Sequence, residues 1–132
     1  MPSLDRREFA AIAVGGAAGA LLRVWLVQLV GSGAPSWPWA TFAINVSGSF
    51  ALAYIATRLQ ERLPLSTYRR PLLGTGFCGA YTTFSTMTIE IIRMLEVDRY
   101  TLAAAYSFAS IAAGFLAIWA ASSLARRTRV LW

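Results

Sequence analysis

The sequence predicts an all-α membrane protein with four transmembrane helices, the third of them broken. The first observation is composition: 57% of the 132 residues are hydrophobic and 14% are charged, against about 25% charged residues in a typical soluble domain. The second is spacing, because the apolar residues form four segments that each reach the roughly 20 residues a membrane helix needs. The connections between them are short, so we assign residues 1–132 to a single domain. The expected helices cover residues 9–30, 39–59, 71–95 and 100–125.

The charged residues exclude several classes of function. The net charge of +6 comes from twelve arginines against six acidic residues, with no lysine and no histidine. Nearly all the arginines lie at the ends of the apolar segments, where they anchor helices, rather than on one soluble face that could bind nucleic acid. One cysteine cannot form an internal disulfide or a thiolate cluster, and a chain without histidine lacks the usual general base. We therefore expect neither an enzyme nor a nucleic-acid-binding protein.

The first segment combines closely spaced glycines with a charge. Gly15 and Gly19 are four residues apart, a spacing that lets another helix approach closely. Arg23 lies past the middle of the same segment, and a guanidinium inside a membrane is costly unless it reaches the surface or lines an aqueous cavity. Two interpretations stay open for Arg23: an anchor that snorkels to the nearer surface, or a fixed positive charge in a vestibule that attracts anions.

A polar stripe runs along the second segment. Thr41, Asn45 and Ser49 follow one another at intervals of four, so a helix presents them on one face. An asparagine inside a membrane must find hydrogen-bond partners, and a bond to another helix would meet that need. Because three polar residues share the face, we favour a polar pathway in which Asn45 serves as an amide donor.

The third segment is expected to contain the functional centre. Its middle carries glycines followed by a run of hydroxyls, and irregular backbone within a membrane needs protein, an ion or water to satisfy it. Transport proteins use such broken helices to turn carbonyl groups toward ions. The glycines are Gly74, Gly76 and Gly79, and the residues with hydroxyls are Thr82, Thr83, Ser85 and Thr86.

If a helix resumes after this break, one of its faces is polar. Hydroxyls can donate to an anion and the edge of a phenyl ring carries positive potential, so such a lining suits a small hydrated anion better than a cation. Glu90 is the only acid inside a spanning segment and is a functional candidate, although an ion pair with Arg93 one turn on is the alternative. The face would carry Thr83, Thr86, Met87 and Glu90, with Phe84 on its edge.

The fourth segment offers a second set of hydroxyls. Tyr106 and Ser110 are four residues apart, and Gly114 follows at the next interval. These residues form a hydroxyl track or, as an equal alternative, contribute to tight packing with neighbouring helices.

The arginines also predict the orientation of the chain. With four spans, the N-terminus, the middle connection and the C-terminus share one side of the membrane. Loops rich in arginine stay in the cytoplasm, and the bias is nine against two, so we expect both termini there. The nine are Arg6, Arg7, Arg58, Arg62, Arg69, Arg70, Arg126, Arg127 and Arg129, and the two are Arg93 and Arg99.

Three motifs are weak alone but specific as an ordered set. They are Gly15-Gly16-x-x-Gly19-Ala20-x-x-Arg23, Thr41-x-x-x-Asn45-x-x-Gly48-x-Phe50 and Gly76-x-x-Gly79-x-x-Thr82-Thr83-Phe84-Ser85-Thr86. Over four segments and nearly the whole chain, they resemble the Fluc (CrcB) family of fluoride channels. The resemblance implies an antiparallel dimer of four-helix subunits in a bacterial inner membrane. It also implies two pores along the subunit interface, which export fluoride passively from the cytoplasm.

The resemblance also assigns residues to a site. It implies a structural sodium ion at the dimer centre, held by the backbone carbonyls of Gly79 and Thr82. It implies that Arg23 lies in the vestibule of the pore. The residues implied to line the fluoride pore are Asn45, Thr83, Phe84, Ser85, Met87, Glu90, Tyr106 and Ser110.

Two features depart from the family pattern. Position 87 is methionine where the family has phenylalanine, so a polarizable thioether replaces the second aromatic edge. The arginine bias is also large for a chain that inserts in both orientations. Two partners are therefore expected as alternatives: a second copy in an antiparallel homodimer, or an oppositely oriented paralogue in a heterodimer.

Two other functions are alternatives to the fluoride channel. A small multidrug exporter depends on a glutamate in its first helix, and the segment 9–30 has none. A membrane scaffold whose glycines and hydroxyls only pack helices would carry no ion flux. In the favoured mechanism, Arg23 concentrates anions, Asn45 and the hydroxyls replace lost water, and Phe84 contributes its ring edge.

Overall fold

The computed structural model of the chain describes residues 5–31, 36–62 and 68–128, and for residues 60–62 it describes the backbone alone. The regular structure in these ranges is helical throughout, which confirms the prediction of an all-α chain. Three helices of the described chain are long and apolar enough to cross a membrane. They are α1 (Arg6–Val30), α2 (Trp39–Arg62) and α5 (Tyr100–Arg127), and in α2 the candidate span is Trp39–Leu59.

The third apolar segment divides into three pieces. A π-helix, η1 (Arg70–Cys78), leads directly into the short α3 (Gly79–Tyr81), and α4 (Phe84–Glu96) begins after two further residues. Both of these residues have extended backbone: Thr82 has φ −76° and ψ 154°, and Thr83 has φ −147° and ψ 115°. The helical hydrogen-bond ladder is therefore interrupted at Thr82 and Thr83.

This interruption is displaced from the glycines at which the sequence analysis expected irregular backbone. The stretch 74–79 is wound as helix, and the extended residues come later because Thr83 is the N-cap of α4. The Thr83 hydroxyl accepts a hydrogen bond from the N–H of Thr86 at 3.2 Å, and an N-cap residue adopts extended backbone. None of η1, α3 and α4 alone reaches the length of a membrane span, so three helices rather than four do so in the described ranges.

The first helix begins three residues before its predicted start. Asp5 is the N-cap of α1, and its carboxylate accepts a hydrogen bond from the N–H of Arg7 at 2.9 Å. At its other end α1 stops at Gly31, whose φ of 75° favours glycine. Tyr68, just before η1, donates its hydroxyl to the second carboxylate oxygen of Asp5 at 3.0 Å. One exposed hydrogen bond thus links the beginnings of α1 and η1.

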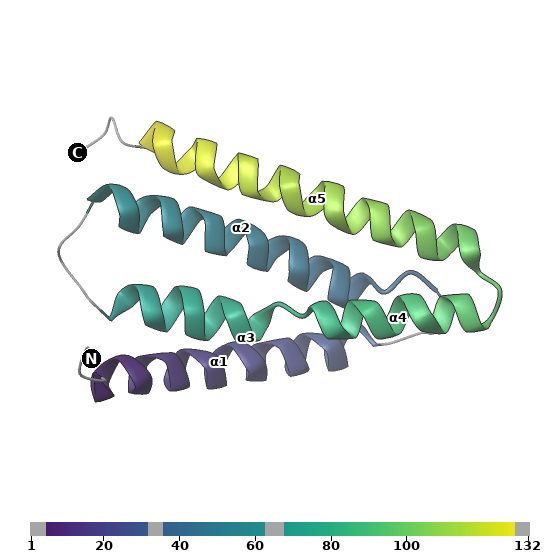
Figure 1. The fold of residues 1–132 in the computed structure, drawn as a ribbon, viewed down its shortest axis with the longest axis horizontal. Coiled ribbons are helices and arrows are strands. Elements are labelled where there is room, and N and C mark those ends of the chain that lie inside the picture. Colours follow the sequence, from purple (N-terminus) through teal and green to yellow (C-terminus); the bar gives the residue numbers. More distant parts are fainter. Residues whose placement is uncertain (1–4, 32–35, 63–67, 129–132) are drawn as a thin grey trace.

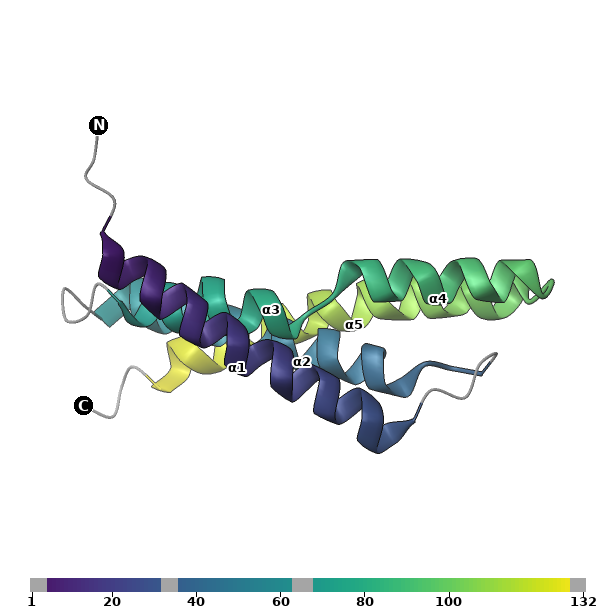
Figure 2. The same cartoon turned by 90° about the horizontal axis from the view of Figure 1, so that it is seen from below.

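The segments lie side by side in two directions. In Figure 1, α1 and the η1–α3–α4 segment run one way while α2 and α5 run the other, so the start of α1 and the end of α5 lie at the same end. Helix α1 contacts η1 and α3, α2 contacts α5 and η1, and α4 contacts α5. Figure 2 shows that α4 and the first half of α5 extend together, away from α1.

Few of the described side chains are buried. A buried cluster of Met94, Ala103 and Tyr106 lies where α4 meets α5. Many large apolar side chains face outward instead, and Phe84 and Phe108 are each 77% exposed. Outward apolar surface of this extent is the kind that lipid or another subunit covers.

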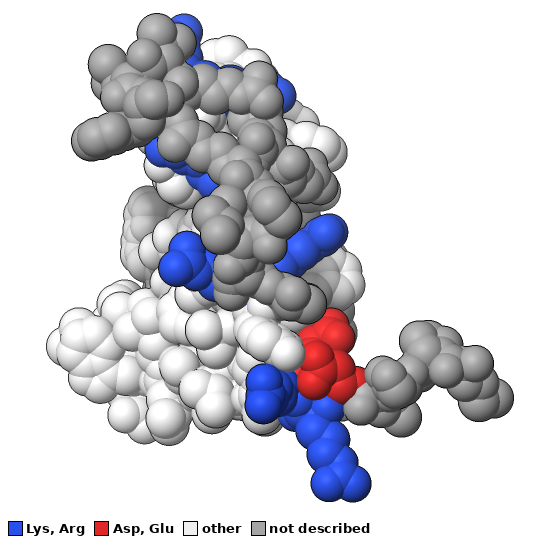
Figure 3. Space-filling view, turned by 90° about the vertical axis from the view of Figure 1, so that its left-hand side faces the viewer, with Lys and Arg blue, Asp and Glu red and all other residues white. Residues whose placement is uncertain are grey.

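Most described arginines gather at the end where α1 begins and α5 ends. Figure 3 views this end and shows several separate basic groups and one acidic patch. The helix ends that the sequence analysis assigned to one side of the membrane are therefore together in space. The described arginines of this basic end are Arg6, Arg7, Arg58, Arg69, Arg70, Arg126 and Arg127.

Candidate functional site

The Asn45 side chain of α2 bonds to the main chain at the interruption of the third segment. Its amide nitrogen donates to the carbonyl oxygen of Thr83 at 2.9 Å, and its amide oxygen accepts from the N–H of Thr83 at 2.8 Å. Both main-chain groups of this buried, extended residue are thereby paired, which matters because an unpaired buried backbone group costs about 1–3 kcal/mol. The polar stripe of the second segment predicts Asn45 as a pathway donor, and in the structure its amide bonds to the main chain at the break.

The hydroxyls after the break form one cluster. The Thr83 hydroxyl donates to that of Thr86 at 2.9 Å and lies 3.3 Å from the hydroxyl of Ser85. Ser85 is exposed, whereas Thr83 is 7% exposed. The start of α4 therefore presents hydroxyl groups from the buried break outward to the surface of the chain.

Glu90 lies one helical turn further along α4 and is bound from two other helices. Thr41 of α2 donates its hydroxyl to one carboxylate oxygen at 2.6 Å, and Tyr106 of α5 donates to the other at 2.9 Å. Both donors are almost fully buried, at 2% and 0% exposure. These hydroxyls, and not Arg93, are the partners of Glu90 in the described ranges, so the ion-pair alternative does not describe this structure.

The two expected pore positions of α4 face different surroundings. Phe84 is 77% exposed, so its ring projects from the chain beside the hydroxyl cluster. Met87 is partly buried and packs against the cluster of Met94, Ala103 and Tyr106. The structure therefore brings Phe84, but not Met87, to the open surface next to the break.

The carbonyl groups of Gly79 and Thr82 lose their usual helical donors at the break. In a continuous α-helix the N–H of Thr83 would pair with Gly79 and that of Thr86 with Thr82. Here the Thr83 N–H donates to Asn45, and the Thr86 N–H donates to the Thr83 hydroxyl. Helix ends with such carbonyls are used as cation ligands in broken membrane helices. In the described ranges, no group of three or more Cys, Asp or Glu side chains could hold a metal ion.

Three buried polar atoms have no hydrogen-bond partner within the described chain. They are Nε of Arg23, the Ser110 hydroxyl and Nε1 of Trp37. Ser110 follows Tyr106 by one turn of α5, which extends the line of polar groups beyond Glu90. Buried groups without a partner are places where water or an ion commonly binds.

Trp37 was not selected as a site residue from the sequence. It packs edge-on against the Tyr106 ring at 5.4 Å between ring centres, and against Phe42 at 5.6 Å. Its place beside Tyr106 depends on how α2 and α5 meet, which composition does not reveal. The only available signal was the position of Trp37 at a segment end, which reads as a membrane-interface residue.

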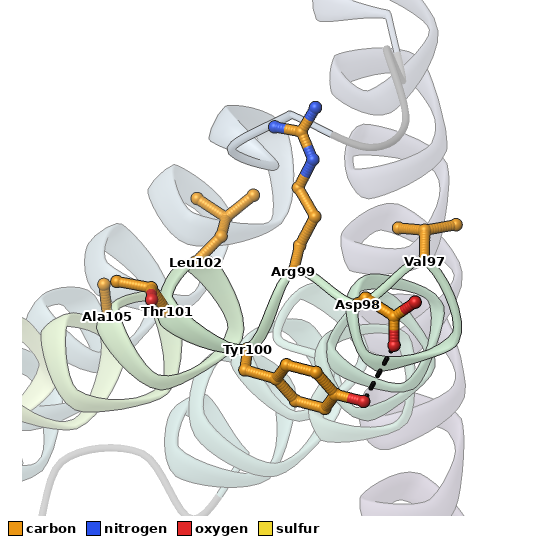
Figure 4. Close-up of a pocket in the computed structure, with 7 residues that line it drawn as sticks. All are labelled: Val97, Asp98, Arg99, Tyr100, Thr101, Leu102 and Ala105. Atoms are coloured by element: carbon orange, nitrogen blue, oxygen red, sulfur yellow. Dashed lines mark hydrogen bonds between the residues drawn. The ribbon is translucent and has the colours of Figure 1, made fainter.

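A shallow depression lies apart from these groups, at the turn from α4 to α5. Figure 4 shows that its lining residues follow one another along this turn, from Val97 to Ala105, with a hydrogen bond from the Tyr100 hydroxyl to Asp98 at 2.8 Å. Asp98 has φ 59°, the left-handed conformation that lets the chain reverse there. The depression is lined by residues of the turn and of the start of α5, and none of them is a predicted site residue.

The chain is similar to known proteins over most of its length. Residues 10–122 match the family model described as CrcB-like protein, Camphor Resistance (CrcB). This range runs from the second turn of α1 to the last turns of α5 and contains every residue assigned above to the site.

Curated relatives resemble the chain over almost its full length. It is 55% identical over 130 residues, 98% of each chain, to a protein named fluoride-specific ion channel FluC 1 from Mycolicibacterium paratuberculosis. A protein of the same name from Mycobacterium tuberculosis shows the same identity and coverage. The fluoride-specific ion channel FluC of Acidobacterium capsulatum is 41% identical over 112 residues, 82% of this chain and 87% of its own.

Proposed function

Since the chain belongs to the CrcB-like family, we propose that it is a subunit of a fluoride-specific ion channel through which fluoride leaves the cytoplasm passively. The relatives are channels and not enzymes, and the chain, with three helices of spanning length, is an integral membrane protein. The observation that carries the proposal is the interruption at Thr82 and Thr83. There hydroxyls, an amide and an exposed phenyl ring gather inside an otherwise apolar segment.

The proposed channel is an antiparallel dimer with its pores along the subunit interface. Gly79, Phe84 and Ser85 are exposed in the single chain, although they belong to the middle of an apolar segment. Polar groups at that depth need a partner other than lipid, so their exposure supports a second subunit on this face. The partner is either a second copy of the chain or an oppositely oriented paralogue. The basic end of this chain favours the cytoplasm, a preference that a paralogue pair would satisfy and that the inverted copy in a homodimer would oppose.

The proposed fluoride path follows residues of four helices, α1, α2, α4 and α5. Arg23 attracts the anion into the vestibule, where its charge raises the local anion concentration. Fluoride then passes the ring edge of Phe84, whose positive rim replaces part of the lost hydration. The further groups along the path are the Asn45 amide, the residues Thr83, Ser85 and Glu90, and the hydroxyls of Tyr106 and Ser110, whereas Met87 packs against the buried cluster behind them.

Asn45 has two tasks in this mechanism. An amide carries two N–H groups, and one of them is given to the Thr83 carbonyl. The second N–H is the proposed donor to fluoride. Because the same side chain holds the break and contacts the ion, a change at this position affects the pore through both.

The carbonyls of Gly79 and Thr82 are proposed to hold a structural sodium ion. The N–H groups that would pair with them in a continuous helix are bound elsewhere, to Asn45 and to the Thr83 hydroxyl, which supports an ion as a partner of these carbonyls. A hard cation suits carbonyl oxygen, and sodium would supply the positive charge that these oxygens need inside a membrane. The residues of the chain itself set the site by turning the backbone at Thr82.

Fluoride efflux from liposomes that contain only this chain tests the proposal. A fluoride electrode should record rapid efflux when sodium is present and little when every buffer has potassium instead, while chloride-loaded vesicles release no chloride. Activity only after a paralogue is added assigns the heterodimer. No fluoride efflux in either preparation would contradict the channel and favour the helix-packing scaffold.

A further inference from the structure

The contact between α1 and η1 is made by main chain against main chain. A methyl group built on Gly15 would overlap the carbonyl oxygen of Leu72, and one built on Gly19 would overlap that of Phe77. A methyl group on Gly76 would in turn lie 2.6 Å from the carbonyl oxygen of Ile12 in α1. No residue larger than glycine fits at these three positions without a shift of backbone.

The winding of the third segment changes opposite these glycines. Gly15 faces the carbonyl of Leu72 and the N–H of Phe77, which are five residues apart, the pair that a π-helix brings together. Gly19 faces the carbonyl of Phe77 and the N–H of Tyr81, which are four residues apart, the pair of an α-helix. The two glycines of α1 thus lie on either side of the change from π to α winding.

The π winding needs an explanation, because it is uncommon beyond a single turn. It extends over nine residues here, and its last turn is closed by a hydrogen bond from the N–H of Gly79 to the carbonyl of Gly74. A π turn holds about one residue more than an α turn, and one residue of α-helix is a rotation of about 100°. Rewinding η1 as α-helix would therefore turn Thr83 away from Asn45.

We propose that Gly15 and Gly19 hold η1 in its π winding and thereby set the rotation at which Thr82 and Thr83 meet Asn45. They act as positioning residues: they touch neither Asn45 nor the hydroxyl cluster, and their effect passes through the main chain of η1. The part of this inference that concerns flux depends on the proposed channel function, whereas the part that concerns winding does not.

A competing explanation is that the glycines of η1 favour the π winding by themselves. Gly74 separates the two explanations, because a methyl group there meets only a Leu52 side-chain carbon at 3.7 Å, an ordinary contact. Alanine raises helix propensity by about 1 kcal/mol over glycine. Gly74→Ala therefore opposes a winding that depends on local flexibility but leaves the α1 contact unchanged.

The chain carries its own probe of this winding. Cys78, its single cysteine, lies at the end of η1 and is 1% exposed. The test measures alkylation of Cys78 by a small thiol reagent in purified variants, together with fluoride efflux from liposomes. Gly15→Ala and Gly19→Ala should label at least about tenfold faster than the unmodified chain, the change produced by about 1.4 kcal/mol in an opening equilibrium. Their fluoride efflux should fall by a similar factor.

Matched controls distinguish rewinding from general loosening. Gly16 lies between the two glycines, and a methyl group there meets one atom at 3.9 Å, so Gly16→Ala and Gly74→Ala should both keep Cys78 protected. A second probe is Ala121→Cys in a Cys78→Ser background, because Ala121 is fully buried on α5. It should stay protected in all four glycine variants.

Three results would overturn the inference. The first is a protected Cys78 in Gly15→Ala and Gly19→Ala. The second is a reactive Cys78 in Gly74→Ala, which would assign the winding to η1 itself and can be measured even where Gly15→Ala does not fold. The third is exposure of Ala121→Cys together with Cys78. If the unmodified chain carries no fluoride, the proposed function fails, and the labelling results still decide the winding.

Discussion

The two sides of the third segment are held by opposite means. On the α1 side, Gly15 and Gly19 let main chain meet main chain with no side chain between them. On the side of α2 and α5, Asn45 binds Thr83 while Thr41 and Tyr106 bind Glu90, all through side-chain hydrogen bonds. The glycine contact brings two helices close together but offers no polar side chain. The polar contact offers side chains that can bind an ion. Fluoride efflux is therefore expected to fall most when residues on the polar side are substituted.

Removal of the Asn45 amide is the largest expected effect. Asn45→Ala leaves the N–H and carbonyl of Thr83 unpaired, at about 1–3 kcal/mol each. Loss of the competent conformation and of the proposed fluoride donor together should reduce fluoride efflux by about a hundredfold or more. The measurement is initial efflux per reconstituted subunit with a fluoride electrode.

A matched control for this variant exists on the same helix. Ser47→Ala removes a 3.0 Å hydrogen bond between α2 and Tyr81 but does not touch the break. Its efflux should stay within about twofold of the unmodified chain, because one neutral hydrogen bond is worth only about 0.5–1.5 kcal/mol. Equal losses in both variants would mean that any contact between α2 and the third segment matters equally.

Neutralising Glu90 is expected to have the next largest effect. Glu90→Gln keeps the size of the side chain but offers one acceptor oxygen where Thr41 and Tyr106 now have two. Hydrogen bonds to a charged group contribute about 1.5–3 kcal/mol, so efflux should fall by roughly tenfold. Thr41→Val and Tyr106→Phe should each reduce efflux less. The effects of the two substitutions should not be additive in the double variant, because both residues bind the same carboxylate. Full additivity in that cycle would argue against a shared network.

The two apolar positions of α4 should differ in effect. Phe84→Leu removes an exposed ring edge, and we expect efflux to fall several-fold. Met87→Leu conserves volume in a residue packed against Met94, and such swaps cost less than about 1.5 kcal/mol, so efflux should change little. A larger loss from Met87→Leu than from Phe84→Leu would show that the thioether, and not the phenyl ring, lines the fluoride path.

The smallest expected effect lies on the glycine side, at its exposed end. The N–H of Arg7 and then the Tyr68 hydroxyl hold the pKa of the Asp5 carboxyl below its ordinary value of 3.8. Since the pKa is lower in the folded chain, the stabilisation is present above pH 3.8 and disappears as the pH falls through the lowered value. Asp5→Ala should lower the melting temperature slightly at pH 7, and the two proteins should melt together at low pH. A large difference at pH 7 would show that this hydrogen bond, and not glycine packing, joins α1 to η1.

Much of the fold can be read from the residues, because apolar length and turn residues mark the helices. The predicted range 39–59 begins where α2 begins, and 100–125 begins where α5 begins. The start of α1 was missed by three residues, because Asp5 caps the helix before the apolar run starts. The polar residues that gather at the break were also visible as motifs.

The rest could not be read from spacing, because it depends on contacts between helices. The π winding of η1 arises where α1 lies against it, and helix propensity does not encode that contact. The hydrogen-bond partner of Asn45 could not be predicted for the same reason. An amide inside a membrane must be hydrogen-bonded, but its position in the sequence does not identify the residue that it bonds to. The hydroxyls bound to Glu90 are 16 and 49 residues away in the sequence, beyond any periodicity argument.

The most direct test of the central claim is an experimental density map of the chain in lipid nanodiscs with sodium fluoride. We expect extended backbone at Thr82 and Thr83, the Asn45 amide bonded to Thr83, and an ion at the carbonyls of Gly79 and Thr82 where two subunits meet. Replacement of sodium by potassium should remove that ion density. An unbroken α-helix through residues 79–90, packed against its neighbours with no polar path beside Phe84, would contradict the account.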